Sequence, residues 1–171
     1  GYGGGINALE NMGGSRMGLS ESEEKEIVKK WRDANPHIVK FWSTIEAAAV
    51  KAIKTGDSIT IHRGIVVSYK WGMLLITLPS GRTICYPRAT IGIETGDGWR
   101  GDHEIIEYEG LNQTTKKWEK VRTYGGKLTE NVVQATARDI LGMVIIRAEQ
   151  SGLPIVFHVH DEIIVEANET Q

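Results

Sequence analysis

Several kinds of residue and segment are scarce in this sequence, and each scarcity excludes a class of protein. Cys85 is the one cysteine among 171 residues, which excludes an internal disulfide and fits a reducing compartment. No apolar run approaches the ~18 residues of a membrane-spanning helix, and no signal peptide is recognisable. Charge of one sign is also lacking: the net charge of −2 gives no overall basic signal for nucleic acid, although a local basic groove remains compatible with it.

The composition is typical of a globular protein. Apolar residues make up 40% of the chain and charged residues 25%. A length of 171 residues suits one domain or a part of a larger one. The chain begins at Gly1 rather than at Met and stops shortly after an acidic motif, so we expect a piece cut from a longer protein.

Helix signals dominate the first third of the chain. Ser20 followed three residues later by Glu23 is a capping box, which predicts the start of a helix. Asn35 as N-cap and Pro36 at the first helical position predict a second helix, which Gly56 ends. The apolar residues between these signals follow helical spacing, so residues 1–55 are predicted to be mainly helical.

The pattern then changes to short β-branched runs separated by turn residues. The segment LLITLPSGRTICYP (74–87) predicts a β-hairpin with its turn at Pro79-Ser80-Gly81. A second hairpin is predicted with strands near 103–109 and 116–123. Residues 88–102 are predicted to form the loop between the two hairpins.

The strongest helix pattern covers residues 129–152 and ends at Gly152. Its apolar residues predict a wide stripe on one face: Val133, Ala137, Ile140, Leu141, Val144, Ile145 and Ala148. Gln134 and Arg138 share a different face. That face is either merely solvated, as most such faces are, or reaches a polar partner. Gln carries a donor and an acceptor, which suits base edges and sugars in a minor groove.

The chain closes with IVFHVHDEIIVEA (155–167), in which His160, Asp161 and Glu162 interrupt two apolar strands. We expect these acids to lie near the core end of both strands. A buried carboxylate is costly unless it is paired or binds a metal. The motif therefore predicts a hairpin whose turn presents His160 and Asp161 together.

Three interpretations of this hairpin remain open on spacing alone. The turn can simply be charged and solvated, as hairpin turns often are. His158 and His160 could bind zinc, with His62 or His103 as a further ligand. The carboxylates could instead bind Mg²⁺, which is usually held by one or two carboxylates together with substrate phosphates.

Four segments, in chain order, resemble motifs of the family A DNA polymerases, most closely the replicative enzymes of phages. They are GYGGG (1–5), which resembles the end of the fingers-helix motif; LPSGRTICYP (78–87), which resembles a palm hairpin; GGKLTENVVQATARDIL (125–141), which resembles the palm helix with Gln134 and Asp139; and VHDEIIVEA (159–167), which resembles motif C. The ordered set is far more specific than any one member, because a lone glycine cluster is most often only a turn.

The resemblance implies an α+β fold, with a helical fingers portion at 1–55 and an incomplete palm at 56–171. The palm would be an antiparallel sheet with a packed helix, and the motif C hairpin would occupy 154–167. The implied partners are primer-template DNA and a deoxynucleoside triphosphate, with two Mg²⁺ ions as cofactors. A processivity factor is neither implied nor excluded. The implied location is the cytoplasm of a bacterium or of a phage-infected host cell, without membrane attachment.

The resemblance also implies a role for individual residues. Asp161 resembles the carboxylate that binds the catalytic magnesium ions, and Glu162 resembles its supporting neighbour. His160 resembles a residue near the primer 3′ end. The remaining implied contacts are Gln134 and Arg138 with DNA, and Tyr2 and Gly3 with the incoming nucleotide.

The sequence departs from the family pattern at several points. It contains no Asp-x-Ser-x-x-Glu segment, which supplies the second metal-binding Asp of the family. The fingers Arg and Lys that grip the triphosphate would precede Gly1. Glu130 stands one turn before Gln134, where the family often has Asn, and Asn131 is one step off. We therefore expect the 171 residues alone to be inactive.

Three alternatives stand beside the polymerase interpretation. A metal-dependent phosphohydrolase or nuclease would use His158, His160 and the two acids. A non-catalytic DNA-binding remnant would use Gln134 with basic side chains, namely Lys116, Lys117, Lys120 and Arg122. The third is a template-dependent RNA polymerase of related single-chain design, because Tyr2 without the residues that precede it does not settle the choice of sugar.

Overall fold

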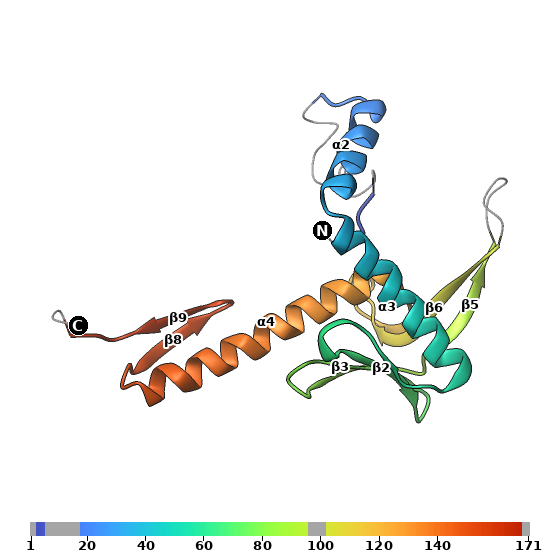
Figure 1. The fold of residues 1–171 in the computed structure, drawn as a ribbon. Coiled ribbons are helices and arrows are strands. Elements are labelled where there is room, and N and C mark those ends of the chain that lie inside the picture. Colours follow the sequence, from blue (N-terminus) through green and yellow to red (C-terminus); the bar gives the residue numbers. More distant parts are fainter. Residues whose placement is uncertain (1–2, 6–17, 96–101, 169–171) are drawn as a thin grey trace.

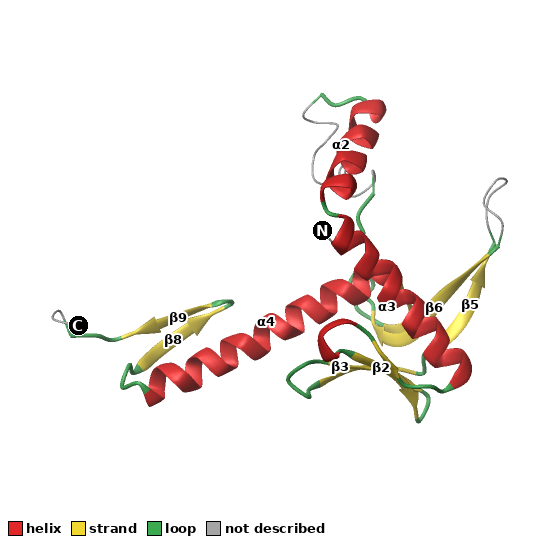
Figure 2. Cartoon of the chain, viewed as in Figure 1, coloured by secondary structure: helices red, strands yellow, loops and turns green. Residues whose placement is uncertain are grey.

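The computed structural model describes residues 3–5, 18–95 and 102–168 of the chain. Helices α2 (Glu21–Ala34), α3 (Pro36–Thr55) and α4 (Gly125–Gln150) combine with antiparallel sheets, as Figures 1 and 2 show. The mixture of helices and antiparallel sheets confirms the α+β prediction. The division into a fingers portion and a palm stays a prediction. Among the described helices, none is both long and apolar enough to cross a membrane.

The strands of the described residues form separate sheets. One sheet has the order β1 (Ile59–Thr60), β2 (Val66–Lys70), β3 (Met73–Thr77) and β4 (Thr83–Pro87), with the short 3-10 helix η2 (His62–Gly64) between β1 and β2. The next has the order β5 (Thr90–Glu94), β6 (His103–Leu111) and β7 (Trp118–Thr123). The last is the hairpin of β8 (Ile155–Val159) and β9 (Glu162–Val165).

Local signals set the ends of the first helices as the sequence predicts. The Ser20 hydroxyl accepts from the Glu23 backbone N–H at 3.4 Å, and the Glu23 carboxylate accepts from the Ser20 N–H at 2.8 Å. Gly56 has a φ of 75°, and its N–H donates to the Ala52 carbonyl at 2.8 Å, which ends α3. Asn35 stands at the start of α3, but its side chain does not cap that helix.

Asn35 instead closes the preceding helix. Its Nδ2 donates to the Trp31 carbonyl oxygen at 2.8 Å, so the amide satisfies an end carbonyl of α2. The Trp31 ring stacks on Trp42 of α3, with centroids 5.9 Å apart and planes 6° apart. The two helices are therefore joined by a side-chain hydrogen bond and an aromatic contact across the short connection.

The core lies where α3 covers the first sheet. Ile45, Ala49 and Ala52 of α3 are fully buried, and they belong to one apolar cluster with Leu74 and Ile76 of β3. The small alanine side chains let the helix approach the sheet closely. Burial of apolar surface in this cluster stabilises the fold by about 25 cal/mol per Å².

Helices α3 and α4 cross at a glycine. A Cβ atom added at Gly125 would lie 2.1 Å from the Trp42 carbonyl oxygen and 3.0 Å from Glu46 Oε2. The first distance is far shorter than any real Cβ contact and is to backbone, whereas the second is a tight contact with the end of a flexible side chain. The first turn of α4 therefore packs directly on the backbone of α3, and only glycine fits there.

The predicted loop over 88–102 is partly wrong. Residues 90–94 form strand β5, which pairs with β6 from Thr90 opposite Glu107 to Glu94 opposite His103. Three of the five strand residues are β-branched, but the pattern is short and includes Gly92. The extended conformation of β5 depends on its pairing with β6, and the local sequence pattern does not indicate that pairing.

Most of the apolar stripe predicted on α4 is exposed, although Leu141 is buried. Leu128 and Val132 are buried in the core, but Val133 is 45% exposed and Ile140 55% exposed. The cause is that only the first part of α4 contacts the core. Figure 1 shows the rest of the helix leaving the core, with the β8–β9 hairpin returning beside it. Helical spacing defines a face, but it does not show which part of the face is covered.

Candidate active site

The acidic motif lies at the turn of the β8–β9 hairpin, as predicted. Val159 pairs with Glu162, so His160 and Asp161 are the turn residues between the strands. His160 has a φ of 49°, a left-handed conformation that is uncommon for residues other than glycine. A tight turn rather than a long loop therefore presents the motif.

The expected burial of the acids is wrong. Asp161 and Glu162 are both exposed, and so are the neighbouring strand residues Val156 (58% exposed) and Phe157 (59% exposed). The reason is that the hairpin lies against α4 outside the main core. Burial among apolar strands consequently gives no argument for a metal, and the exposed turn leaves the carboxylates accessible to ligands from solution.

A zinc site of the predicted kind is not assembled. Across residues 3–5, 18–95 and 102–168 there is no group of three or more His, Cys, Asp or Glu side chains placed to hold a metal. His103 pairs with Glu94 at 3.2 Å on the second sheet, and His62 lines a pocket beside α3. Neither joins His158 and His160 as a ligand.

The chemistry of the turn fits Mg²⁺ better than zinc. Asp161 and Glu162 supply adjacent carboxylates, and carboxylate oxygens are ligands that Mg²⁺ accepts. Mg²⁺ commonly takes one or two protein carboxylates and completes its coordination with water and substrate phosphates. The exposed turn suits that arrangement, because nothing in the described hairpin buries the two acids.

Helix α4 places Gln134 and Arg138 on its exposed surface, one turn apart. Glu130, one turn earlier, forms an ion pair with Lys127, with 2.9 Å between Oε2 and Nζ. Figure 1 shows β8 running back alongside α4, so that the hairpin turn points toward the middle of the helix. Strand β8 of the hairpin therefore contacts the helix that carries Gln134 and Arg138.

Asp139 joins two of the segments that carry the family resemblance. Its carboxylate accepts from Ser80 Oγ and from Arg82 Nε, each at 2.6 Å. Arg82 Nη2 also donates to the Ala135 carbonyl oxygen at 2.6 Å. The hydroxyl of Ser80 and then the guanidinium of Arg82 hold the pKa of Asp139 below its ordinary value. The turn between β3 and β4 is thus attached to the middle of α4.

Replacing Asp139 by Asn should lower the free energy of unfolding at neutral pH, because the charge-assisted bonds to Ser80 and Arg82 are weakened. A depressed carboxyl pKa contributes stability that is present above the unfolded-state pKa of about 3.9 and is lost as pH falls through the folded-state pKa. The difference between the parent and Asp139→Asn should therefore be constant from about pH 5 to 8 and shrink in acid. Urea unfolding across this pH range measures it.

Asp33→Asn is the matched control, since Asp33 pairs only with exposed Lys29 on α2. It should change stability little at any pH. An equal effect of Asp139→Asn at pH 7 and in acid would contradict the assignment of the stabilisation to the ionised carboxylate.

A second contact connects the same hairpin and helix. Asn131 Nδ2 donates to the Tyr86 hydroxyl at 2.9 Å, and the Tyr86 ring meets Tyr108 edge-on with centroids 5.0 Å apart. Burial raises the pKa of Tyr86 to about 12. Asn131 is therefore committed to a structural contact, which explains why it does not occupy the exposed face of Gln134.

The glycine-rich start of the chain contacts the first turn of α4. Gly3 has a φ of 79°, and a Cβ there would lie 3.1 Å from Tyr124 Cε2 and 3.2 Å from the Gly126 Cα. Tyr2 lies outside the described residues, and so do residues 6–17, which are part of the predicted helical region. The nucleotide-binding role of Tyr2 and Gly3 stays a prediction.

The basic side chains near the second hairpin are partly neutralised. Lys120 pairs with Glu107 at 3.4 Å, and Arg122 pairs with Glu94 and with Glu107. These acids lie on β5 and β6 beside the basic residues. The hairpin therefore does not present a continuous basic surface at Lys120 and Arg122.

Comparison with known proteins gives one informative relative. A DNA polymerase of Bacillus phage SP02 is 44% identical to this chain over 166 residues, which cover 97% of the chain and 25% of that protein. The chain thus spans about a quarter of the length of this relative. No protein-family model matches the chain. No solved structure matches it either.

Proposed function

We propose that this chain is a segment of a template-directed DNA polymerase of the family A type. The observation that carries the proposal is the 44% identity to a phage DNA polymerase, which extends over 97% of the chain. The order of the four motifs supports the family, and the α+β arrangement is compatible with helical fingers at 1–55 and an incomplete palm at 56–171.

Asp161 and Glu162 are the proposed metal ligands and catalytic carboxylates. The exposed turn lets substrate phosphates approach them, and their oxygens are of the type that Mg²⁺ accepts. Bound Mg²⁺ would supply charge stabilisation for the attacking 3′ oxygen and the leaving pyrophosphate during transfer of a nucleotide. The chain's own contribution is to present both acids on a tight turn between paired strands.

The proposed DNA contacts come from helix α4 and from the hairpin turn. Gln134 and Arg138 are exposed on α4, and Gln134 can donate to and accept from the minor groove of the primer-template duplex. His160 at the hairpin turn would lie near the primer 3′ end. Tyr2 and Gly3 would contact the incoming deoxynucleoside triphosphate. Such an enzyme would work in the cytoplasm of a bacterium or a phage-infected cell.

Primer extension by the full-length protein and by the 171-residue chain tests this proposal. The full-length protein should extend a 5′-labelled primer with Mg²⁺ and deoxynucleoside triphosphates, and EDTA should abolish extension. The 171-residue chain should not, because its sequence has no Asp-x-Ser-x-x-Glu segment to supply the second metal-binding Asp. Extension by the short chain would contradict the proposal that this chain carries only part of the active site. No extension by the full-length protein would overturn the polymerase proposal.

A further inference from the structure

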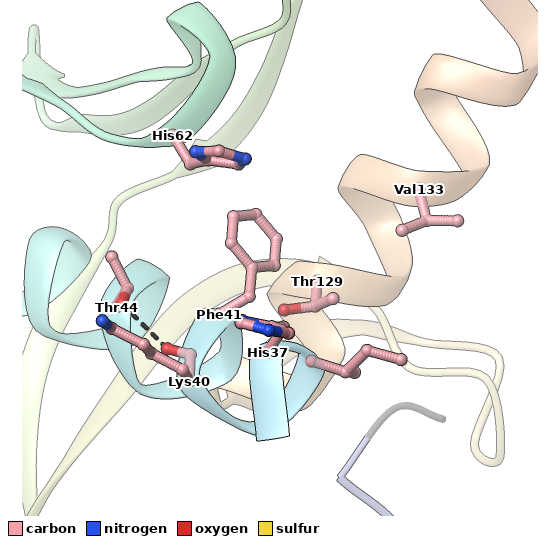
Figure 3. A pocket seen from close by; sticks show the side chains of 8 residues that line it. His37, Lys40, Phe41, Thr44, His62, Thr129 and Val133 are labelled. Atoms are coloured by element: carbon pink, nitrogen blue, oxygen red, sulfur yellow. Dashed lines mark hydrogen bonds between the residues drawn. The ribbon is translucent and has the colours of Figure 1, made fainter. Parts of the chain in front are cut away.

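A pocket of about 720 Å³ lies between α3, η2 and the first turns of α4 (Figure 3). It is outside the proposed site, since neither the β8–β9 turn nor Gln134 lines it. Its lining combines cationic, hydroxyl and apolar side chains: His37, Ile38, Lys40, Phe41, Thr44, His62, Thr129 and Val133. No carboxylate is among these lining residues, so the pocket has a positive electrostatic character.

The histidines and the lysine supply hydrogen-bond donors. Arg63 Nε donates to His62 Nε2 at 3.0 Å, so that nitrogen acts as an acceptor. Nδ1 is then the ring nitrogen of His62 that is left to donate. Lys40 brings an ammonium group to the same pocket, and the guanidinium of Arg63 is hydrogen-bonded to His62.

A buried hydroxyl in the pocket lacks a partner. Thr129 is only 4% exposed, and its Oγ1 makes no hydrogen bond to any residue that the structure describes. Figure 3 shows this hydroxyl oxygen pointing toward Phe41 and His37. An unsatisfied buried hydroxyl is costly, so a polar atom of a ligand would stabilise this arrangement.

Aromatic rings also face the pocket. Figure 3 shows Phe41 and His62 pointing toward one another from α3 and η2. Flat aromatic rings next to a lysine suit a nucleobase that carries a phosphate. One lysine suits the single charge of a phosphodiester, whereas a free triphosphate carries several charges and needs several cations or a metal.

We propose that this pocket binds one unpaired nucleotide of a DNA strand, with its base against Phe41 and His62 and its phosphate at Lys40. The proposal rests on the proposed function for the identity of the ligand. Val133 of the pocket lining directly precedes Gln134, the residue proposed to contact the duplex. The pocket and the proposed duplex contact are thus on the same turn of α4, so both could engage one DNA molecule.

Binding of fluorescein-labelled dT8 to the 171-residue chain tests the pocket without requiring polymerase activity. Lys40→Gln and His62→Gln should each weaken binding about tenfold, and Lys40→Gln should reduce the salt dependence by about one counterion. Lys51→Gln removes the same charge from the same helix about 16 Å away and should leave binding unchanged. Fluorescence anisotropy at several salt concentrations measures these changes.

Thr129→Val separates a ligand contact from a structural role. Val has nearly the same shape and removes the unpaired hydroxyl, so the melting temperature should not fall, whereas binding of dT8 should weaken several-fold if Thr129 contacts the base. Equal binding by the parent chain, Lys40→Gln and His62→Gln would overturn the proposal. Competition by dTMP as strong as that by unlabelled dT8 would assign the pocket to free nucleotides and overturn it also. Neither outcome affects primer extension by the full-length protein.

Discussion

In the full-length protein, Asp161→Asn should lower the rate of primer extension about 1,000-fold or more. A metal ion contributes several kcal/mol of charge stabilisation to such a reaction, and each ~1.4 kcal/mol changes the rate tenfold. Asn keeps the size of the side chain but lacks the charge that holds Mg²⁺. Single-turnover extension with saturating nucleotide measures the chemical step, and the dissociation constant for primer-template DNA should change little.

Glu166→Gln is the matched control for this variant. Glu166 is an exposed carboxylate just beyond β9, at the opposite end of the hairpin from Asp161, and its backbone N–H donates to the Pro154 carbonyl at 3.1 Å. Its replacement should leave extension near the parent rate. Full activity of Asp161→Asn, or an equal loss in both variants, would contradict the assignment of catalysis to the hairpin turn.

Gly125→Ala should destabilise the fold by about 3 kcal/mol or more, because overpacking against a rigid neighbour is costly. The added Cβ would lie 2.1 Å from the Trp42 carbonyl oxygen, so α4 must shift away from α3. For a chain of this size, such a loss lowers the melting temperature by roughly 10 °C. Thermal unfolding followed by circular dichroism checks this expectation.

Gly142→Ala is the comparison that isolates the close contact. Gly142 lies in the same helix, and a Cβ added there meets nothing within 4 Å. Alanine should therefore stabilise α4 by about 0.5–1 kcal/mol through its better helix propensity. The two substitutions should shift the melting temperature in opposite directions. Destabilisation of the same size in both would show that the helix crossing does not depend on Gly125.

Local chemistry explains which elements are predictable from the sequence. The capping box of Ser20 and the left-handed Gly56 act within a few residues, and both helix ends are confirmed. The hairpin at 155–165 is likewise formed between neighbouring strands. Strand β5 is different, because its conformation depends on pairing with β6 across a connection. Sequence patterns therefore indicate structure formed between neighbouring residues, but not pairing between segments separated by a long connection.

In the candidate site too, the local features are predictable from the sequence and the contacts between distant segments are not. The motif letters locate Asp161 and Glu162 at a turn, but they do not reveal that the turn is exposed beside α4. The bonds from Ser80 and Arg82 to Asp139 join positions 59 and 57 residues apart, so no local pattern indicates them. The pocket beside Thr129 is formed by three separate elements, and only the folded arrangement brings its donors together.

The lengths of α4 and β8 have a consequence for how the hairpin turn is positioned. The five residues of β8 span about 17 Å, which equals the rise of about eleven helical residues. Figure 1 shows β8 running back beside α4, so the turn at the end of β8 lies alongside the helix rather than beyond its end. Adding one residue to the end of α4 would displace the returning strand by about 1.5 Å and rotate it by about 100° around the helix axis. The length of α4 therefore determines where the hairpin turn lies, and hence on which side of the molecule Asp161 and Glu162 are exposed.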